Sequence, residues 1–314
     1  MPEADAGTPS FQALYEELMD RSGRAAGADA LAAWLPKARQ ALGSLGRYAR
    51  RDSPGNEYAV EREDLYQWYA LSRVNDHLLL SFQARADFYV APSSRPDGWQ
   101  EWMTQIVAAD EYVSFFEALG FQSFTRLPFS PFHHEVVEVI ETPDADGVSV
   151  DHVFWPGLMF GDMLFSRAGV RVRCPATLID KAVAETSRLY FTYRRLRRQA
   201  MDLSYGWGSN SQWATSFRRD YDSGGRFWYN VEGGHPLGDG YRASFPPSWL
   251  LDEDDLTVAE RVEVLTHRCF VRCPKDGGDL FPFGDRFDVE RGKDYGHSGD
   301  GLRDADRHAE PGAH

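Results

Sequence analysis

The stretch EREDLYQWYALSRVNDHLLLSFQA, residues 61–84, decides the fold class that we predict for this chain. It reads as one long helix or as two stacked helices, because its apolar residues recur at helical spacing. Near the start of the chain, four residues follow the same i, i+3, i+4, i+7 spacing of an amphipathic helix: Phe11, Leu14, Tyr15 and Leu18. These patterns predict a mainly α chain with a few short strands.

Further helical patterns lie on both sides of this stretch. Residues 31–42 continue the amphipathic style, and residues 97–119 form another helical pattern with Gly120 placed just past its end. Residues 177–200 predict a long helix, and the arginines in its last turns suit the negative end of a helix dipole. The sequence TVAE at 257–260 is a capping box, which predicts a short helix to about His267.

Strand-like segments are short and lie between these helices. Residues 148–154 and 170–173 alternate in polarity, as strands do, whereas HEVVEVIE at 134–141 is compatible with a strand or a helix. No internal boundary is evident, so we expect a flexible N-terminus over residues 1–8 and a single catalytic domain over residues 9–284. Residues 285–314 are nearly devoid of apolar side chains, which predicts a disordered acidic and Gly-rich tail.

Composition excludes several classes of partner. The chain has 314 residues and a formal net charge of −14, so neither a nucleic acid nor an anionic membrane is an expected partner. No apolar run approaches the roughly 18 residues that a membrane span needs. The three cysteines, Cys174, Cys269 and Cys273, and the absence of a secretory signal pattern predict a reduced, cytoplasmic protein.

Histidines outside the predicted tail are the first candidates for chemistry. On a helix, His77 shares a face with Val74 and Leu80, so it is either a core residue or a pocket residue that faces a ligand. His133 and His134 are adjacent, and Glu138 would share a helical face with His134, an arrangement that could bind a metal together with His152. The alternative for this cluster is a solvated loop edge.

The segment GWGSNSQW at 206–213 is the most unusual local sequence. Trp207 and Trp213 supply flat apolar surfaces, while Asn210 and Gln212 offer hydrogen-bond donors and acceptors. Arg218 follows shortly after, and arginine is suited to a bidentate grip on a carboxylate. This segment is therefore either an amino-acid-binding wall or an aromatic corner that only packs.

Three stretches carry a family resemblance: PFHHEVVEVIE at 131–141, WPGLMFGDMLFSRAGVRV at 155–172 and DLSYGWGSNSQWATSFRRDY at 202–221. From about residue 65 to about residue 231, the chain resembles the haem-dependent L-tyrosine hydroxylases of lincomycin-, hormaomycin- and anthramycin-type pathways, which belong to the haem-dependent aromatic oxygenases. The resemblance implies a helical domain that binds haem b non-covalently. It also implies hydroxylation of L-tyrosine, or a similar phenolic amino acid, ortho to the phenol, to give L-DOPA in antibiotic biosynthesis, with peroxide or dioxygen plus a reductant.

Residue roles follow from that resemblance. His134 would be the iron ligand, with His133 and His152 as alternatives, and His77 would be the distal catalytic group. Arg218 or Arg219 would hold the carboxylate of a small aromatic amino-acid substrate, and Arg218 is the first choice. The remaining substrate contacts would come from the segment 206–213, through Trp207, Asn210, Gln212 and Trp213.

Two other functions stay open at this stage. One is a non-haem metal enzyme that uses His133 or His134 together with Glu138 and His152. The other is a non-catalytic protein that binds a small aromatic ligand through the Gly- and Trp-rich segment. Each of the three is compatible with a homo-oligomer.

Overall fold

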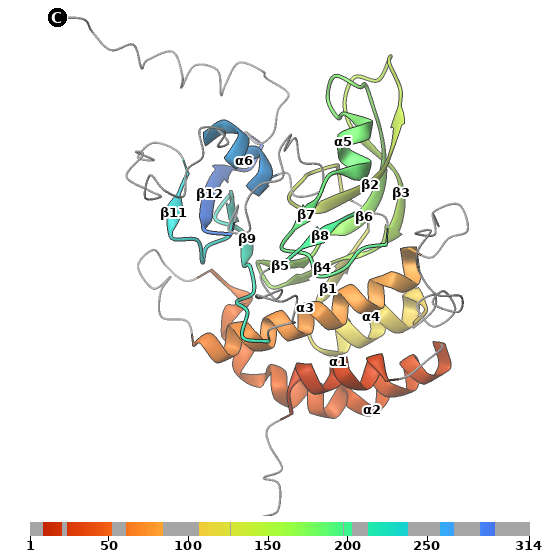
Figure 1. The fold of residues 1–314 in the computed structure, drawn as a ribbon, viewed down its shortest axis with the longest axis vertical. Helices are drawn as coiled ribbons and strands as arrows, with labels where there is room; N and C mark the ends of the chain where they lie inside the picture. Colours follow the sequence, from red (N-terminus) through yellow and green to blue (C-terminus); the bar gives the residue numbers. More distant parts are fainter. Residues whose placement is uncertain are drawn as a thin grey trace, which may run out of the picture.

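The fold is known from a computed structural model, which describes residues 9–20, 24–51, 61–83, 107–125, 127–196, 198–202, 213–237, 258–266 and 283–292. Helices α1 to α4 lie together at one end of the molecule, and the sheets lie at the other (Figure 1). The described strands form a seven-stranded, a three-stranded and a two-stranded sheet. The protein is therefore an α/β protein, and the prediction of a mainly α, single helical haem-binding domain is wrong.

The helical layer consists of α1 (Phe11–Met19), α2 (Arg24–Leu42), the 3₁₀ helix η1 (Gly43–Ala49), α3 (Arg62–Gln83) and α4 (Ala109–Ala118). Helix α3 confirms the long helix predicted over 61–84, and it is buried on most of its surface because α1 contacts one side and strands contact the other. Gly120 follows α4 with a φ of +93°, a left-handed conformation that glycine adopts without strain, as predicted for the end of this helix.

The large sheet has the strand order β1-β4-β5-β9-β10-β12-β11. Its strands pair in antiparallel fashion except for β11 and β12, which are parallel. Their bounds are β1 (Gln122–Phe124), β4 (Gly157–Phe160), β5 (Met163–Ser166), β9 (Asp220–Ser223), β10 (Arg226–Tyr229), β11 (His235–Pro236) and β12 (Asp285–Glu290). Its β4–β5 end packs against α3 and α4 through an aromatic core that includes Trp68, Phe116 and Phe165.

The three-stranded sheet resolves the ambiguous segment HEVVEVIE as a strand. It contains β2 (His134–Glu141), β6 (Ala168–Cys174) and β3 (Ser149–Trp155), with β6 in the centre. Valines on β2 and β6 are buried together beneath α5 (Lys181–Thr186), which fits the β-branched content of the segment. A bulge between Val136 and Glu138 shifts the register of β2 against β6.

The predicted helix over 177–200 is mostly absent. Only α5 is helical, and the backbone turns extended at Ser187 before β7 (Leu189–Tyr190) pairs with β8 (Ala200–Met201). The arginines of this region have tertiary partners instead of a helix end: Arg195 binds Asp76 and Glu135 at 2.7 and 2.8 Å. Long-range ion pairs therefore override the local helical pattern.

The C-terminal boundary also differs from the prediction. The short helix α6 (Val258–Thr266) confirms the capping-box helix, and β12 lies between β10 and β11. Because Phe287 and Val289 of β12 pack against a buried cluster, residues 285–290 belong to the fold and not to a tail. The predicted flexible residues 1–8 and the rest of the predicted tail, from 293, lie outside the described residues.

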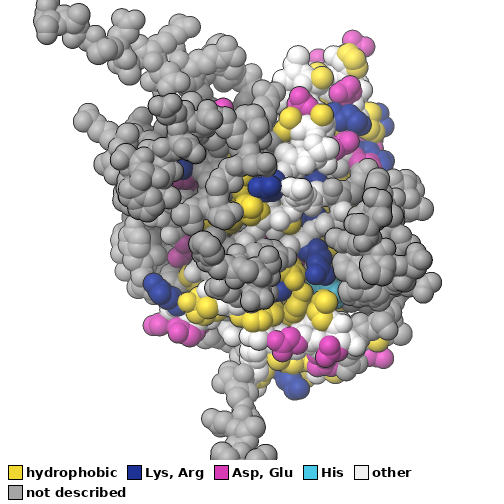
Figure 2. All heavy atoms as spheres, in the orientation of Figure 1, with side chains coloured by type: hydrophobic (Ala, Val, Ile, Leu, Met, Phe, Trp, Pro, Cys, Tyr) yellow, Lys and Arg dark blue, Asp and Glu magenta, His cyan; other side chains and the backbone are white. Residues whose placement is uncertain are grey.

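None of the described helices is both long and apolar enough to span a membrane. On the face shown in Figure 2, hydrophobic side chains form a band over the region of α1 and α3, with acidic and basic side chains below it.

Candidate functional site

A cavity of about 330 Å³ lies where α3, β5 and β9 meet the chain around residues 191, 202, 215–218 and 283. Its volume is at the lower end of the range for small-molecule pockets, about 300–1,000 Å³. Aromatic rings make up much of its wall: Tyr69, Phe165, Phe191, Phe217 and Phe283. The cavity therefore offers apolar surface for one ring-sized group.

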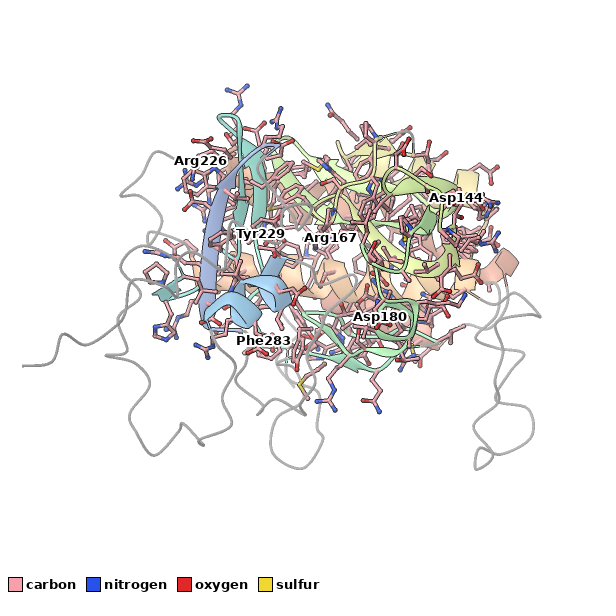
Figure 3. The ribbon with its side chains drawn as sticks, turned by 90° about the horizontal axis from the view of Figure 1, so that it is seen from above. Asp144, Arg167, Asp180, Arg226, Tyr229 and Phe283 are labelled. Atoms are coloured by element: carbon pink, nitrogen blue, oxygen red, sulfur yellow. The ribbon has the colours of Figure 1, made fainter. Side chains whose placement is uncertain are left out.

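A buried charge cluster of Arg167, Asp220 and Arg218 forms one side of this cavity. Asp220 accepts hydrogen bonds from Arg167 Nη2 at 3.0 Å, from Arg218 Nε at 2.6 Å and from the Asn230 backbone N–H at 2.8 Å. Burial alone raises the pKa of Asp220, but the charges of Arg218 and Arg167 lower it below its ordinary value. In Figure 3, Arg167 lies between the strands that carry Tyr229 and the three-stranded sheet.

The hydrogen bonds of Arg167 use only part of its guanidinium. Nε donates to the Pro131 carbonyl at 3.1 Å and Nη2 donates to Asp220, whereas Nη1 takes part in neither bond. Arg167 also lines the cavity, and a guanidinium group is well suited to binding a carboxylate.

A carboxylate lines the same cavity. The Tyr69 hydroxyl lies 3.1 Å from both oxygens of Asp202, and both residues border the cavity. Glu232 also lines the cavity, and it is bound by Arg219. Burial raises the pKa of Glu232, against the opposing effect of Arg219. The cavity thus combines aromatic rings with groups of both charges.

The predicted catalytic residue, His77, lies outside this cavity lining. It is buried on α3 with its ring 5.9 Å from that of Tyr15, in an edge-on arrangement, and its Nδ1 has no hydrogen-bond partner. Burial and the charge of Arg194 lower the pKa of His77 to about 4, so the imidazole is neutral at pH 7.

The predicted iron ligand, His134, is fully buried at the start of β2. Its ring stacks on Phe129 at 5.7 Å, its Nδ1 lies 3.1 Å from the backbone of Ser130, and its Nε2 has no partner. Burial and Arg167 lower its pKa to about 4, against the opposing effect of its hydrogen bond to the Ser130 carbonyl. The alternative ligand His133 lies 3.8 Å from Asp222, and burial together with neighbouring cationic groups lowers its pKa to about 3.

The proposed non-haem metal set does not come together. Because 134–141 is a bulged strand, the helical spacing that would join His134 to Glu138 does not exist. Glu138 is held by Arg171 at 2.5 Å, and His152 packs against Phe154 with ring centroids 4.9 Å apart. Across the ranges that the structure describes, no three His, Cys, Asp or Glu side chains are grouped as a metal site.

The haem site implied by the resemblance requires His77 and His134 to face one shared space. Glu135, next to His134 on β2, accepts hydrogen bonds from Arg195, which also binds Asp76 on α3. Neighbouring side chains on a strand point to opposite faces, so His134 points away from α3, where His77 lies. Neither histidine lines the cavity. These residues do not fit the axial and distal pair of a haem site.

Of the predicted substrate contacts, Arg218 is among the residues that line the cavity. Trp213 is not among the lining residues: its ring centroid lies 5.3 Å from that of Tyr15 and 4.1 Å from the guanidinium carbon of Arg73. Trp207, Asn210 and Gln212 lie outside the described residues.

Sequence reasoning missed Arg167, Asp220, Asp202 and Tyr69. Arg167 left one visible signal, since it is one of two charged residues, with Asp162, inside the mostly apolar run 158–170. A buried arginine is rarely placed in such a run without a partner.

Comparisons of the chain with protein-family models, with curated proteins and with solved structures gave no match.

Proposed function

We propose that the protein binds a small zwitterionic aromatic molecule, of the class of the aromatic α-amino acids, in the cavity beside α3. The observation that carries the proposal is the lining of this one cavity, which combines aromatic rings, the guanidinium of Arg167 and the carboxylate of Asp202. A ligand carboxylate would accept from Arg167 and Arg218, and an ammonium group would be attracted by Asp202. The rings would cover the ligand side chain.

The proposal covers binding, and it does not include haem-dependent hydroxylation. His134 points away from α3, which carries His77, and none of the described residues that line the cavity is a histidine. The aromatic amino acid implied by the resemblance is retained because the cavity supports it independently.

The test is a calorimetric titration of the full chain with L-tyrosine and with three probes that each lack one of its groups. L-Tyrosine has all three groups, tyramine lacks the carboxylate, 3-(4-hydroxyphenyl)propionate lacks the ammonium, and L-alanine lacks the ring. We expect tyrosine to bind most tightly and alanine most weakly. Absence of saturable binding for every probe at millimolar concentration would refute the proposal.

Two variants test which side chain binds the carboxylate of the ligand and which binds its ammonium group. Loss of a charge-assisted hydrogen bond should weaken binding about tenfold, which corresponds to about 1.4 kcal/mol. We expect Arg167→Gln to weaken binding of the two carboxylate-bearing phenolic probes but not of tyramine. We expect Asp202→Asn to weaken binding of the two phenolic amines but not of the propionate. Arg226→Gln is the matched control, because Arg226 pairs with Asp288 across the neighbouring strands β10 and β12, where both side chains are partly exposed, and neither residue lines the cavity.

A further inference from the structure

A second cluster of aromatic side chains surrounds a buried cation next to the cavity. The guanidinium carbon of Arg73 lies 3.8 Å from the ring centroid of Tyr193, 4.1 Å from Trp213, 4.7 Å from Tyr15 and 5.9 Å from Tyr69. Arg73 is only 2% exposed. The distances are those of cation–π contacts, which are worth about 2 kcal/mol when the cation is desolvated. We call these four rings the Arg73 cage.

The cage brings together chain segments that are far apart in sequence. Tyr15 belongs to α1, Tyr69 and Arg73 lie one turn apart on α3, and Tyr193 follows β7. The hydroxyls of Tyr15 and Tyr193 lie 3.0 Å apart, which closes the ring of contacts. Arg73 on α3 therefore contacts aromatic rings from α1, from α3 itself and from two segments outside the helices and strands, at Tyr193 and Trp213.

Tyr69 connects the cage to the cavity. Its ring contacts the Arg73 guanidinium, and its hydroxyl lies within hydrogen-bond distance of both oxygens of Asp202. Asp202 and Trp213 are also the two described residues that flank segment 203–212. Both are thus held from the same turn of α3, Asp202 by Tyr69 and Trp213 by Arg73.

We propose that Arg73 is a positioning residue for the cavity: by fixing Tyr69 it holds the Asp202 carboxylate where the ligand ammonium binds. This inference rests on the proposed function, since it explains how the carboxylate that binds the ligand ammonium is held in place. Arg73 does not line the cavity, so its effect on the ligand is indirect. Loss of Arg73 should weaken binding of the ligand ammonium and not of its carboxylate, because Arg167 and Arg218 are held by Asp220 and not by the cage.

The experiment compares Arg73→Ala with Arg73→Lys, using tyrosine and 3-(4-hydroxyphenyl)propionate as probes. We expect Arg73→Ala to weaken tyrosine about tenfold, with less than about a twofold effect on the propionate, because only tyrosine has an ammonium. Arg73→Lys keeps the charge but lacks the planar guanidinium, so its loss for tyrosine should be smaller. Arg171→Ala is the control, since Arg171 also lies over an aromatic ring, that of Phe154 at 5.5 Å, but outside the cavity.

Chemical rescue and a double variant separate positioning from general damage. Guanidinium ions at millimolar concentration should enter the cage of Arg73→Ala and restore tyrosine affinity, whereas sodium at equal ionic strength should not. In an Asp202→Asn background, Arg73→Ala should cause little further loss of tyrosine affinity, because both substitutions affect the same interaction with the ligand ammonium.

The outcomes distinguish the two proposals. If the wild-type protein binds neither probe, the proposed function is wrong and the role of Arg73 falls with it. If the wild type binds but Arg73→Ala weakens both probes equally, or guanidinium restores nothing, the positioning role alone is overturned.

Discussion

Asp220→Asn is the substitution that tests the charge cluster most directly. The carboxylate is 2% exposed and accepts from two guanidinium groups and one backbone N–H, at 2.6 to 3.0 Å. An amide keeps the shape but removes the negative charge, so Arg167 and Arg218 would be left buried side by side. Removing one member of a buried ion pair costs about 3–5 kcal/mol. We expect a loss of that size in the free energy of unfolding.

The assay is urea denaturation, with thermal melting as a second measurement. A loss of 3–5 kcal/mol corresponds to a fall in Tm of the order of 10 °C. Asp288→Asn is the control: its pair with Arg226 is more than one-third exposed on both sides, so it should cost less than about 1 kcal/mol. A cost for Asp220→Asn within about 1 kcal/mol of the control would refute the view that this cluster is a buried network.

The pH dependence of the same variant gives an independent check. Arg218 and Arg167 hold the pKa of Asp220 below its ordinary value in the folded state. A group with a lowered pKa in the folded state contributes stability above its unfolded pKa and loses it as the pH falls through the folded pKa. The wild-type protein should therefore lose this contribution only in acid, and Asp220→Asn should lack that part of the acid dependence.

Three further predictions address packing, titration and haem. Gly169→Ala should destabilise the protein by about 1–3 kcal/mol, because an added Cβ would lie 2.2 Å from the Trp155 side chain. Gly147→Ala is the control and should be near neutral, because nothing lies within 4 Å of its added Cβ. Equal melting temperatures for the two variants would contradict this prediction. His77 has a folded pKa of about 4 against an ordinary value of 6.5, so its contribution to stability should be lost as the pH falls from 6.5 towards 4, and His77→Gln should flatten that part of the stability curve. Added hemin should show no difference in Soret absorbance between wild type and His134→Ala, and a Soret band that requires His134 would restore the haem hypothesis.

Local patterns predicted the elements that depend on neighbouring residues. The apolar stripe of α1, the long α3 and the left-handed Gly120 after α4 all follow from spacing or from backbone preference. The alternation at 148–154 and 170–173 likewise predicted parts of β3 and β6. These signals lie within a few residues of one another, so a single sequence is sufficient to reveal them.

Elements held by distant partners were not predictable in this way. Arg195 binds Asp76 across 119 positions and Glu135 across 60, which removes residues 189–196 from the helix that their spacing suggests. Segment 134–141 became a strand because β6 pairs with it. The site divides similarly: Arg218 follows a recognisable motif, whereas the joint placement of Asp202 and Tyr69 depends on a contact across 133 positions.

The two buried arginine clusters differ in what they can do, although both lie beside α3. In the first, Arg195 is shared by Asp76 and Glu135, and it borders a space of about 20 Å³, enough for a single water. In the second, Arg167 and Arg218 bind Asp220 beside a cavity of about 330 Å³. A cluster without room for a ligand affects stability alone.

Glu135→Gln tests this distinction. The carboxylate is 4% exposed and accepts two hydrogen bonds from Arg195, at 2.9 and 2.8 Å. Asp76 stays in place to balance the arginine, so we expect a loss of about 1–3 kcal/mol in the free energy of unfolding, less than for Asp220→Asn. Affinity for tyrosine should not change, because Glu135 does not line the larger cavity. Calorimetric titration of Glu135→Gln below its melting temperature measures this, and a clear loss of tyrosine affinity would show that the two clusters are coupled through α3.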